Sequence, residues 1–140
     1  MMHEKLRKDT GKLVDDWLEI AYDDFEVANY LYREQKRYLY MAYMCQQSIE
    51  KAIKAVIQQN GKIPQKVHKL ELIAKDADIW KLLDVQQKSF LKSLSMFYIA
   101  TRYPGIREKL SRGLTNQRAD SILQSTKEML VWLCKHLRNL

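Results

Sequence analysis

The sequence predicts an all-α protein, an up-and-down antiparallel four-helix bundle with a short extra helix after the second long helix. Three observations support this prediction. Apolar residues recur at helical spacing in four long segments, only 4 Gly and 2 Pro occur among 140 residues, and no Gly/Ser-rich linker or repeat interrupts the chain. Amphipathic segments joined by short connections are typical of antiparallel bundles. We therefore expect a single domain over residues 1–140, with its core at about 14–139.

The first helix is predicted at about residues 14–35. Its apolar stripe is Trp17, Ala21, Phe25, Ala28, Leu31 and Tyr32, which follows the helical period. Asp24 falls on the same stripe, which is unusual for a carboxylate. We expect it either to lie at the rim in water or to pair with a cation from another helix.

The second helix shows the clearest pattern. Its apolar stripe is Ala42, Cys45, Gln46, Ile49, Ala52, Ile53 and Val56, at spacings i, i+3, i+4 and i+7. Asn60-Gly61 then supplies a left-handed C-terminal cap, and Pro64 prevents continuation of the helix. A short helix is expected at about 69–77, directly after His68.

The third helix is predicted from about Asp84 to Thr101, with Leu91, Leu94, Tyr98 and Thr101 on one side. Asp84 and Gln87 have the spacing of an N-terminal capping box, and Pro104-Gly105 ends the helix. A basic loop of about ten residues should follow. The fourth helix then starts near Thr115 or Asn116, with the apolar face Ala119, Ile122, Leu123, Thr126, Met129, Leu130, Leu133 and Leu137.

The positive charge is concentrated near the C-terminus. The net charge is +7, and residues 102–140 contain eight basic but only three acidic side chains. Such a cluster attracts the phosphates of a nucleotide or of RNA, or it forms a solvated surface, and the spacing leaves both readings open. No apolar run approaches the roughly 20 residues of a membrane span. The charged first 16 residues do not resemble a signal peptide, so we expect no membrane association and a cytoplasmic location.

Few residues of the chain are suited to conventional catalysis or metal binding. The sequence has no Gly-rich phosphate loop, and its three histidines lack metal-ligand spacing. We therefore expect no metal and no cofactor. The two cysteines lie on or beside apolar stripes and are predicted to be free thiols that pack as small hydrophobes.

A polar edge on the second helix is the first candidate for a ligand site. It carries Gln47, Glu50, Lys51 and Lys54, whose side chains lie within about one turn of each other. The alternative is a solvated face with an internal Glu50–Lys54 pair that contributes a few tenths of a kcal/mol. The pattern gives both interpretations similar weight.

The end of the third helix is the second candidate. Arg102 and Tyr103 precede Pro104, which holds residue 103 extended. We expect this kink to aim both side chains inward, toward Lys51, Lys54 and His68 on the same end of the bundle. Arginine there suits a phosphate or carboxylate, with Glu50 and Asp24 as charge partners within the chain. The alternative is an ordinary helix terminus, with Arg102 near the negative end of the helix dipole.

These fragments, in this order, resemble the HEPN domain, the "higher eukaryotes and prokaryotes nucleotide-binding" module. The resemblance covers about residues 15–105. It rests on Trp17, Ala21, Asp24 and Ala28, on Gln46-Gln47-Ser48-Ile49-Glu50-Lys51-Ala52-Ile53-Lys54-Ala55, on His68-Lys69-Leu70, and on Thr101-Arg102-Tyr103-Pro104. It implies a four-helix up-and-down bundle that is commonly a homodimer. Such proteins are often encoded beside a small nucleotidyltransferase, as a two-component or toxin–antitoxin pair.

Some members of the family are metal-independent ribonucleases, with an arginine followed four to six residues later by a histidine. The sequence departs from that motif, because no histidine follows Arg102 until His136 and no other arginine has one in the required window. The matching branch is therefore a non-catalytic module that binds a nucleotide or a phosphate group. The alternatives are a ribonuclease with an atypical site and a purely structural dimeric partner. RNA also remains open as a ligand.

A homodimer is also suggested by the surplus of aromatic residues near the second helix. Tyr38, Tyr40 and Tyr43 lie close together there. Extra aromatic surface on a small bundle often marks an interface.

Overall fold

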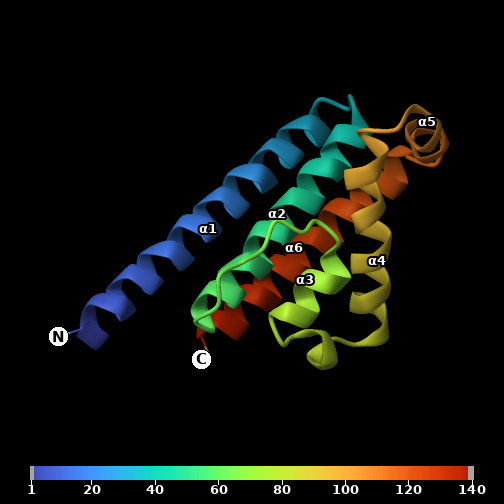
Figure 1. The fold of residues 1–140 in the computed structure, drawn as a ribbon. Coiled ribbons are helices and arrows are strands. Elements are labelled where there is room, and N and C mark those ends of the chain that lie inside the picture. Colours follow the sequence, from blue (N-terminus) through green and yellow to red (C-terminus); the bar gives the residue numbers. More distant parts are fainter. Residues whose placement is uncertain (1, 139–140) are drawn as a thin grey trace.

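All regular structure in the described part of the chain is helical (Figure 1). The computed structural model describes the backbone of residues 2–138 and the side chains of residues 10–137. Along the chain follow α1 (Met2–Arg33), α2 (Tyr38–Gln59), α3 (Leu70–Asp76), the 3₁₀ turn η1 (Trp80–Leu82), α4 (Val85–Ala100), α5 (Pro104–Arg112) and α6 (Asn116–Arg138). The all-α prediction is confirmed, whereas the exact up-and-down four-helix arrangement stays a prediction. Residue 139, the last of the expected core, lies outside the described residues.

Helix α2 is the central element of the fold. It packs against α1, α3, α4, α5 and α6, and in Figure 1 it runs between α1 on one side and α3 and α4 on the other. Its sequence explains this position, because 14 of its 22 residues are buried. A helix that is buried over most of its surface must be surrounded by other elements. No helix in the described part of the chain is long and apolar enough to cross a bilayer.

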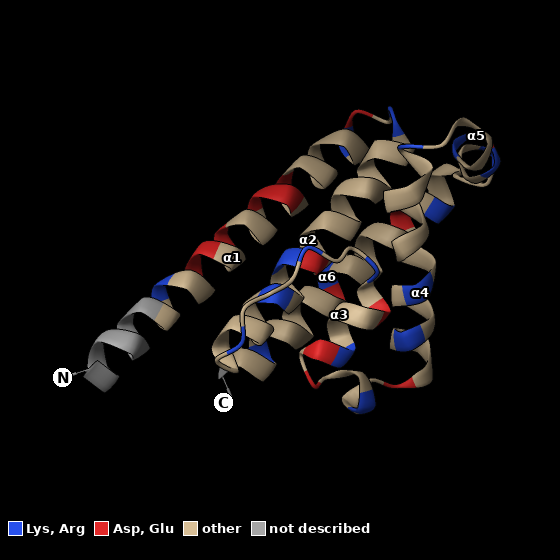
Figure 2. Cartoon of the chain, in the orientation of Figure 1, with Lys and Arg blue, Asp and Glu red and all other residues tan. Residues whose placement is uncertain are grey.

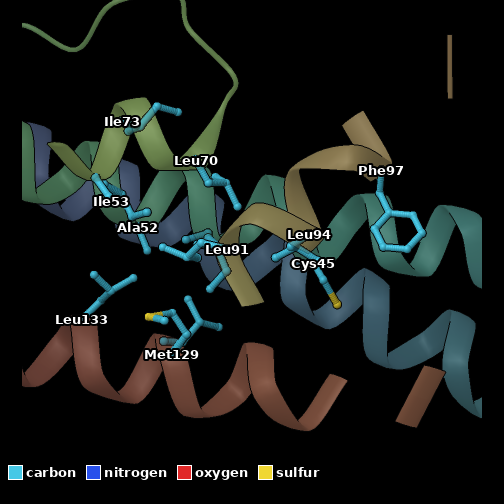
Figure 3. Close-up of a cluster of buried hydrophobic side chains, with 14 of the residues drawn as sticks. Cys45, Ala52, Ile53, Leu70, Ile73, Leu91, Leu94, Phe97, Met129 and Leu133 are labelled. Atoms are coloured by element: carbon cyan, nitrogen blue, oxygen red, sulfur yellow. The ribbon is translucent and has the colours of Figure 1, made fainter. Parts of the chain in front are cut away.

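The core is formed where α2, α3, α4 and α6 meet (Figure 3). Ile53 of α2, Leu91 and Leu94 of α4 and Leu133 of α6 are each at most 1% exposed. Burying one such side chain contributes about 1.5–3 kcal/mol, so these predicted stripes account for much of the packing. The burial of these four residues confirms the predicted stripes at these positions, whereas Tyr98, Thr101 and Leu137 at the stripe ends are only partly buried.

The helix ends follow the predicted signals. The Asp84–Gln87 capping box is confirmed: the Gln87 N–H donates to Asp84 Oδ1 at 2.8 Å, and the Asp84 N–H donates to Gln87 Oε1 at 2.9 Å. Gly61 has φ +82°, the left-handed conformation expected of it after α2. The start of α1 was predicted too late, since residues 2–13 lack an apolar period yet continue the helix.

The predicted basic loop after the third helix is wrong, because residues Pro104–Arg112 form helix α5. Tyr103 is extended, with φ −123° and ψ 113°, as expected for a residue before proline. Proline lacks an N–H and so ends α4, but its fixed φ also suits the first position of a new helix. Pro104 therefore ends one helix and begins the next, whereas the sequence pattern does not predict the helix that begins there.

Candidate functional site

The carboxylate of Glu50 is the centre of a buried polar network on α2. The residue is fully buried, and four donors surround its two oxygens. Oε1 lies 3.3 Å from Gln46 Nε2 and 3.0 Å from His68 Nδ1. Oε2 lies 3.3 Å from Lys51 Nζ and 3.1 Å from Lys54 Nζ. A buried carboxylate is tolerated only when it is paired and hydrogen-bonded in this way.

Helical spacing and one loop contact assemble this network. Gln46 and Lys54 each lie four residues from Glu50, one on either side, so the three share a face of α2. The segment between α2 and α3 returns across this face, because Gln46 Nε2 also donates to the carbonyl oxygen of His68 at 3.0 Å. Gln47 completes the network: it accepts from Lys51 Nζ at 3.0 Å and donates to Gln46 Oε1 at 2.7 Å.

Two carboxylates at this site have pKa values that shift in opposite directions. Burial alone would raise the pKa of Glu50, but Lys51, Lys54 and the hydrogen bond from His68 outweigh it, so the pKa lies below its ordinary value. Asp24 on α1 is half-buried, and burial raises its pKa; Asp23 and Glu50 add to this effect, and Lys51 opposes it. Asp24 is thus close enough to Lys51 and Glu50 to interact with both.

An aromatic stack lies beside the network. The His68 and Tyr98 rings are stacked with centroids 4.1 Å apart and an angle of 16° between their planes. The guanidinium carbon of Arg102 lies 3.8 Å from the centroid of Tyr98. Two planar groups this close to the centre of one ring would clash with each other if they lay on the same face of it. His68 and Arg102 therefore occupy opposite faces of the Tyr98 ring.

Arg102 is held by its own helix end. Its Nη1 donates to the carbonyl oxygen of Tyr98 at 2.8 Å and to Thr101 Oγ1 at 3.0 Å. These two bonds use both protons of Nη1. Among the described residues, the Nε–Nη2 edge of the guanidinium has no hydrogen-bond partner, and the side chain is exposed. That edge is the fork that binds a phosphate or carboxylate through two parallel hydrogen bonds.

The structure brings most of the predicted site residues together, but not in the expected manner. Gln47, Glu50, Lys51, Lys54 and His68 form one network. Glu50 is fully buried and Lys54 is only 6% exposed. These two residues therefore position their neighbours and do not face solvent.

The expectation that Pro104 aims both Arg102 and Tyr103 inward is wrong. Arg102 joins the site only through Tyr98. Tyr103 is 59% exposed. Tyr103 is the extended residue directly before α5, and α5 packs at the other end of α2, where Arg107 donates to the Tyr40 hydroxyl.

Three residues at the site were assigned to the core by the sequence pattern. Gln46 is buried at the centre of the network, although its position had been counted with the apolar stripe. Tyr98 had been placed on an apolar face, where an aromatic residue at helical spacing is usually core. Trp17 donates from Nε1 to Gln58 Oε1 at 3.4 Å, and Lys54 Nζ lies 5.9 Å from its ring. Of these three, only Gln46 could have been recognised as a site residue from the sequence, because an amide is unusual within an apolar stripe.

A groove of about 590 Å³ adjoins the network between α3 and α4. This volume lies within the usual range for small-ligand sites. The lining combines apolar side chains with a few charged ones: Val67, His68, Lys69, Glu71, Lys92, Ser95, Met96, Tyr98 and Ile99. His68 and Tyr98 belong both to this lining and to the aromatic stack, so the groove and the polar network share a wall.

Charge is distributed unevenly around the site (Figure 2). Acidic residues mark successive turns of α1, whereas α4 and α5 carry mainly basic residues. Within the part of the chain that the structure describes, no group of three or more His, Cys, Asp and Glu side chains is placed to hold a metal ion.

Comparison with known proteins assigns the chain to a family. The HEPN domain family model matches residues 14–137, and the chain belongs to the HEPN domain family. Among solved structures, the fold is similar to the crystal structure of TT1696 from Thermus thermophilus. The TM-score is 0.73 and the identity 22%, over 87% of this chain and 96% of that one. At this identity the similarity supports the fold alone. None of the curated proteins matches this sequence.

Proposed function

We propose that this chain is a non-catalytic module that binds a nucleotide or another phosphorylated ligand on an up-and-down four-helix bundle. The free Nε–Nη2 edge of Arg102 is the observation that carries the proposal. An exposed guanidinium held over an aromatic ring, with one edge free, is already oriented for bidentate contact with phosphate. Ring stacking and the two Nη1 bonds reduce the entropy that the side chain would lose on binding.

The network around Glu50 supports this proposal through its charge. Lys51, Lys54 and Arg102 carry three positive charges, and Glu50 compensates one of them. Asp24 interacts with Lys51 and offsets a second of these charges. A local excess of positive charge favours an anion, and Lys51, Arg102 and the exposed Tyr103 are the side chains accessible to it.

The family suggests the biological setting of this module. HEPN proteins of this kind commonly form homodimers and act beside a small nucleotidyltransferase, in a two-component or toxin–antitoxin pair. We propose the same partnership for this chain, in the cytoplasm. Purification of the chain with the product of the neighbouring gene would test it, and a stable complex with a nucleotidyltransferase is the expected result.

Calorimetric titration of ATP tests the ligand proposal directly. Arg102→Ala should weaken binding by more than the roughly 0–1 kcal/mol typical of an exposed ion pair. Arg112→Ala is the matched control, because Arg112 lies in the same basic segment and pairs with Glu108 on the surface of α5. Equal affinity of the wild type and Arg102→Ala, or no ATP binding by either, would favour a purely structural partner protein.

A ribonuclease with an atypical site is the second candidate, and the Glu50–His68 hydrogen bond of 3.0 Å favours it. A carboxylate that orients an imidazole is a common arrangement for general acid–base catalysis. The Tyr98 ring, however, lies between His68 and Arg102, which argues against both groups acting on one reacting phosphate. Purified protein is therefore expected to cleave RNA no faster than His68→Ala, with or without a chelator. Cleavage that requires both His68 and Arg102 would establish the enzyme instead.

A further inference from the structure

Helix α1 carries an exposed apolar stripe. Leu13, Ile20 and Val27 follow each other at intervals of seven residues and are 44%, 43% and 45% exposed. Residues seven apart lie on nearly the same side of a helix. Tyr30, next along this face, is 59% exposed. Aligned apolar side chains that remain exposed indicate a surface for another molecule.

The surroundings of the stripe are strongly acidic. From residue 12 to residue 34 the sequence has seven carboxylates and two basic side chains, although the whole chain has a net charge of +7. Asp16 and Asp23, again seven residues apart, border the stripe along its length. Figure 2 shows acidic residues along α1. A partner for this helix should therefore offer an apolar surface with basic edges.

The groove between α3 and α4 has those properties. Met96 and Ile99 in its lining are 41% and 37% exposed, and Lys69 and Lys92 add positive charge. Glu71 offsets part of this charge, since its Oε1 lies 3.7 Å from Lys92 Nζ.

More basic residues continue beyond the groove. Lys75 and Lys88, like Lys92 of the groove lining, each place Nζ within 5.7 Å of the Trp80 ring centre. The groove and its basic edge thus complement the acidic, apolar stripe of α1 in both polarity and charge.

The stripe and the groove lie on either side of the polar network. Asp24, on the stripe-bearing helix, interacts with Lys51, and His68 of the same network lines the groove. Figure 1 shows the same order, with α1 on one side of α2 and α3 and α4 on the other. A two-fold axis passing near the network can therefore bring the stripe of each copy onto the groove of the other. That is the self-complementary contact that a symmetric dimer requires.

We propose that the α1 stripe of one copy of this chain docks into the α3–α4 groove of a second copy, forming a two-fold dimer with two equivalent contacts. This inference rests on the homodimer included in the proposed function and specifies its surfaces. The tyrosines that first suggested an interface have partners within the chain: Tyr38 with Asn116, Tyr40 with Arg107, and Tyr43 with Tyr98. Ile20 and Val27 on α1 and Met96 in the groove are instead exposed apolar side chains.

Charge reversal followed by sedimentation tests the docking. The wild type should sediment as a dimer of the 16.7 kDa chain. Lys69→Glu/Lys92→Glu in the groove, or Asp16→Lys/Asp23→Lys beside the stripe, should each weaken association more than about tenfold, because like charges then meet twice per dimer. A chain carrying all four changes should regain the dimer, since opposite charges meet again.

A matched control and a cross-link separate this dimer from other arrangements. Lys81→Glu/Lys109→Glu changes the charge equally at exposed positions outside the groove, and it should leave association unchanged. In a Cys134→Ser background, Ile20→Cys with Met96→Cys should give a covalent dimer on oxidation, whereas either cysteine alone should give none.

The possible outcomes separate this inference from the ligand proposal. A dimer that withstands both charge reversals, or that is not restored by the combined variant, would overturn the docking. A monomer at every concentration would overturn both the docking and the homodimer. In either case the ATP titration of Arg102→Ala still decides ligand binding, because it compares this variant with the wild type under the same conditions.

Discussion

His68 Nδ1 lies 3.0 Å from Oε1 of Glu50, and this contact joins the segment before α3 to the centre of α2. The carboxylate is fully buried, whereas 38% of the His68 side chain is exposed. One hydrogen bond therefore connects the interior of the bundle to the wall of the groove. A substitution at Glu50 should therefore change both the stability of the protein and the position of His68.

Glu50→Gln should lower the free energy of unfolding by about 3–5 kcal/mol, the usual cost of removing one partner of a buried ion pair. The side chain of Lys54 is only 7% exposed and would lose its counter-charge. Urea denaturation at pH 7 measures the loss. Glu108→Gln on α5 is the control: it also removes an i, i+4 partner, here from Arg112, but both side chains are exposed. Glu108→Gln should lower the free energy of unfolding by only about 0–1 kcal/mol. An equal loss in the two variants would contradict the stabilising role of the buried network.

The contribution of Glu50 to stability should depend on pH in a defined direction. Its pKa in the folded protein lies below the ordinary value of 4.5. Between the two pKa values the unfolded chain binds more protons, so stability rises with pH in that window. The contribution is therefore present above about 4.5 and is lost as the pH falls through the lower, folded-state pKa. The difference between wild type and Glu50→Gln should shrink in acid, and a difference that is constant from pH 7 to pH 3 would argue against an ionised Glu50.

Asp24 should show the opposite dependence. Burial raises its pKa above the ordinary value of 3.8, so the folded protein holds the proton more tightly than the unfolded chain. The contribution of Asp24 to the free energy of unfolding then falls as the pH rises from 3.8 through the folded-state pKa. Relative to the wild type, the free energy of unfolding of Asp24→Asn should therefore be higher at pH 7 than at pH 3. Denaturation curves of both proteins at the two pH values give this comparison, and the reverse order would show that Lys51 dominates over burial.

The two free cysteines should react very differently with a thiol reagent. Cys45 is buried, and burial raises its pKa to about 12, so almost no thiolate forms at neutral pH. Cys134 is only partly buried, with its Sγ 2.9 Å from the hydroxyl of Tyr22. A colorimetric thiol assay at pH 8 should detect one reactive group in the folded protein and two in denaturant. Cys134→Ser should remove the fast group, and a fast reaction persisting in that variant would mean that α2 opens readily.

The helices could largely be predicted from the sequence because burial imposes a period on their residues. Ile53 and Leu133, for example, lie on stripes that the pattern identified, and both are fully buried. Helix α5 could not be predicted in this way, since none of its residues is buried and its first residue is a proline. Its formation follows from the fixed φ of Pro104, which periodicity does not detect.

The candidate site was only partly predictable for a different reason. Spacing on one helix placed Gln47, Glu50 and Lys54 together, because side chains up to one turn apart are neighbours whatever the fold. The burial of Glu50 depends on the return of the chain at His68, a contact across 18 residues that no local pattern contains. Tyr98 was missed because an aromatic residue on an apolar stripe is usually core.

Tyr98 should control how well Arg102 binds an anion, and a pair of substitutions separates its ring from its hydroxyl. Tyr98→Phe keeps the ring between His68 and Arg102, so ATP affinity should stay close to that of the wild type. Tyr98→Leu removes the π face on which the guanidinium rests, a contact worth about 0.5–1 kcal/mol at an exposed site and more when desolvated. Its affinity should fall toward that of Arg102→Ala. The double variant Tyr98→Leu/Arg102→Ala should then be no weaker than Arg102→Ala alone, because the ring acts through the guanidinium. Calorimetry on the wild type, Tyr98→Leu, Arg102→Ala and the double variant completes this double-mutant cycle. Fully additive losses of ATP affinity would mean that Tyr98 contacts the nucleotide independently of Arg102.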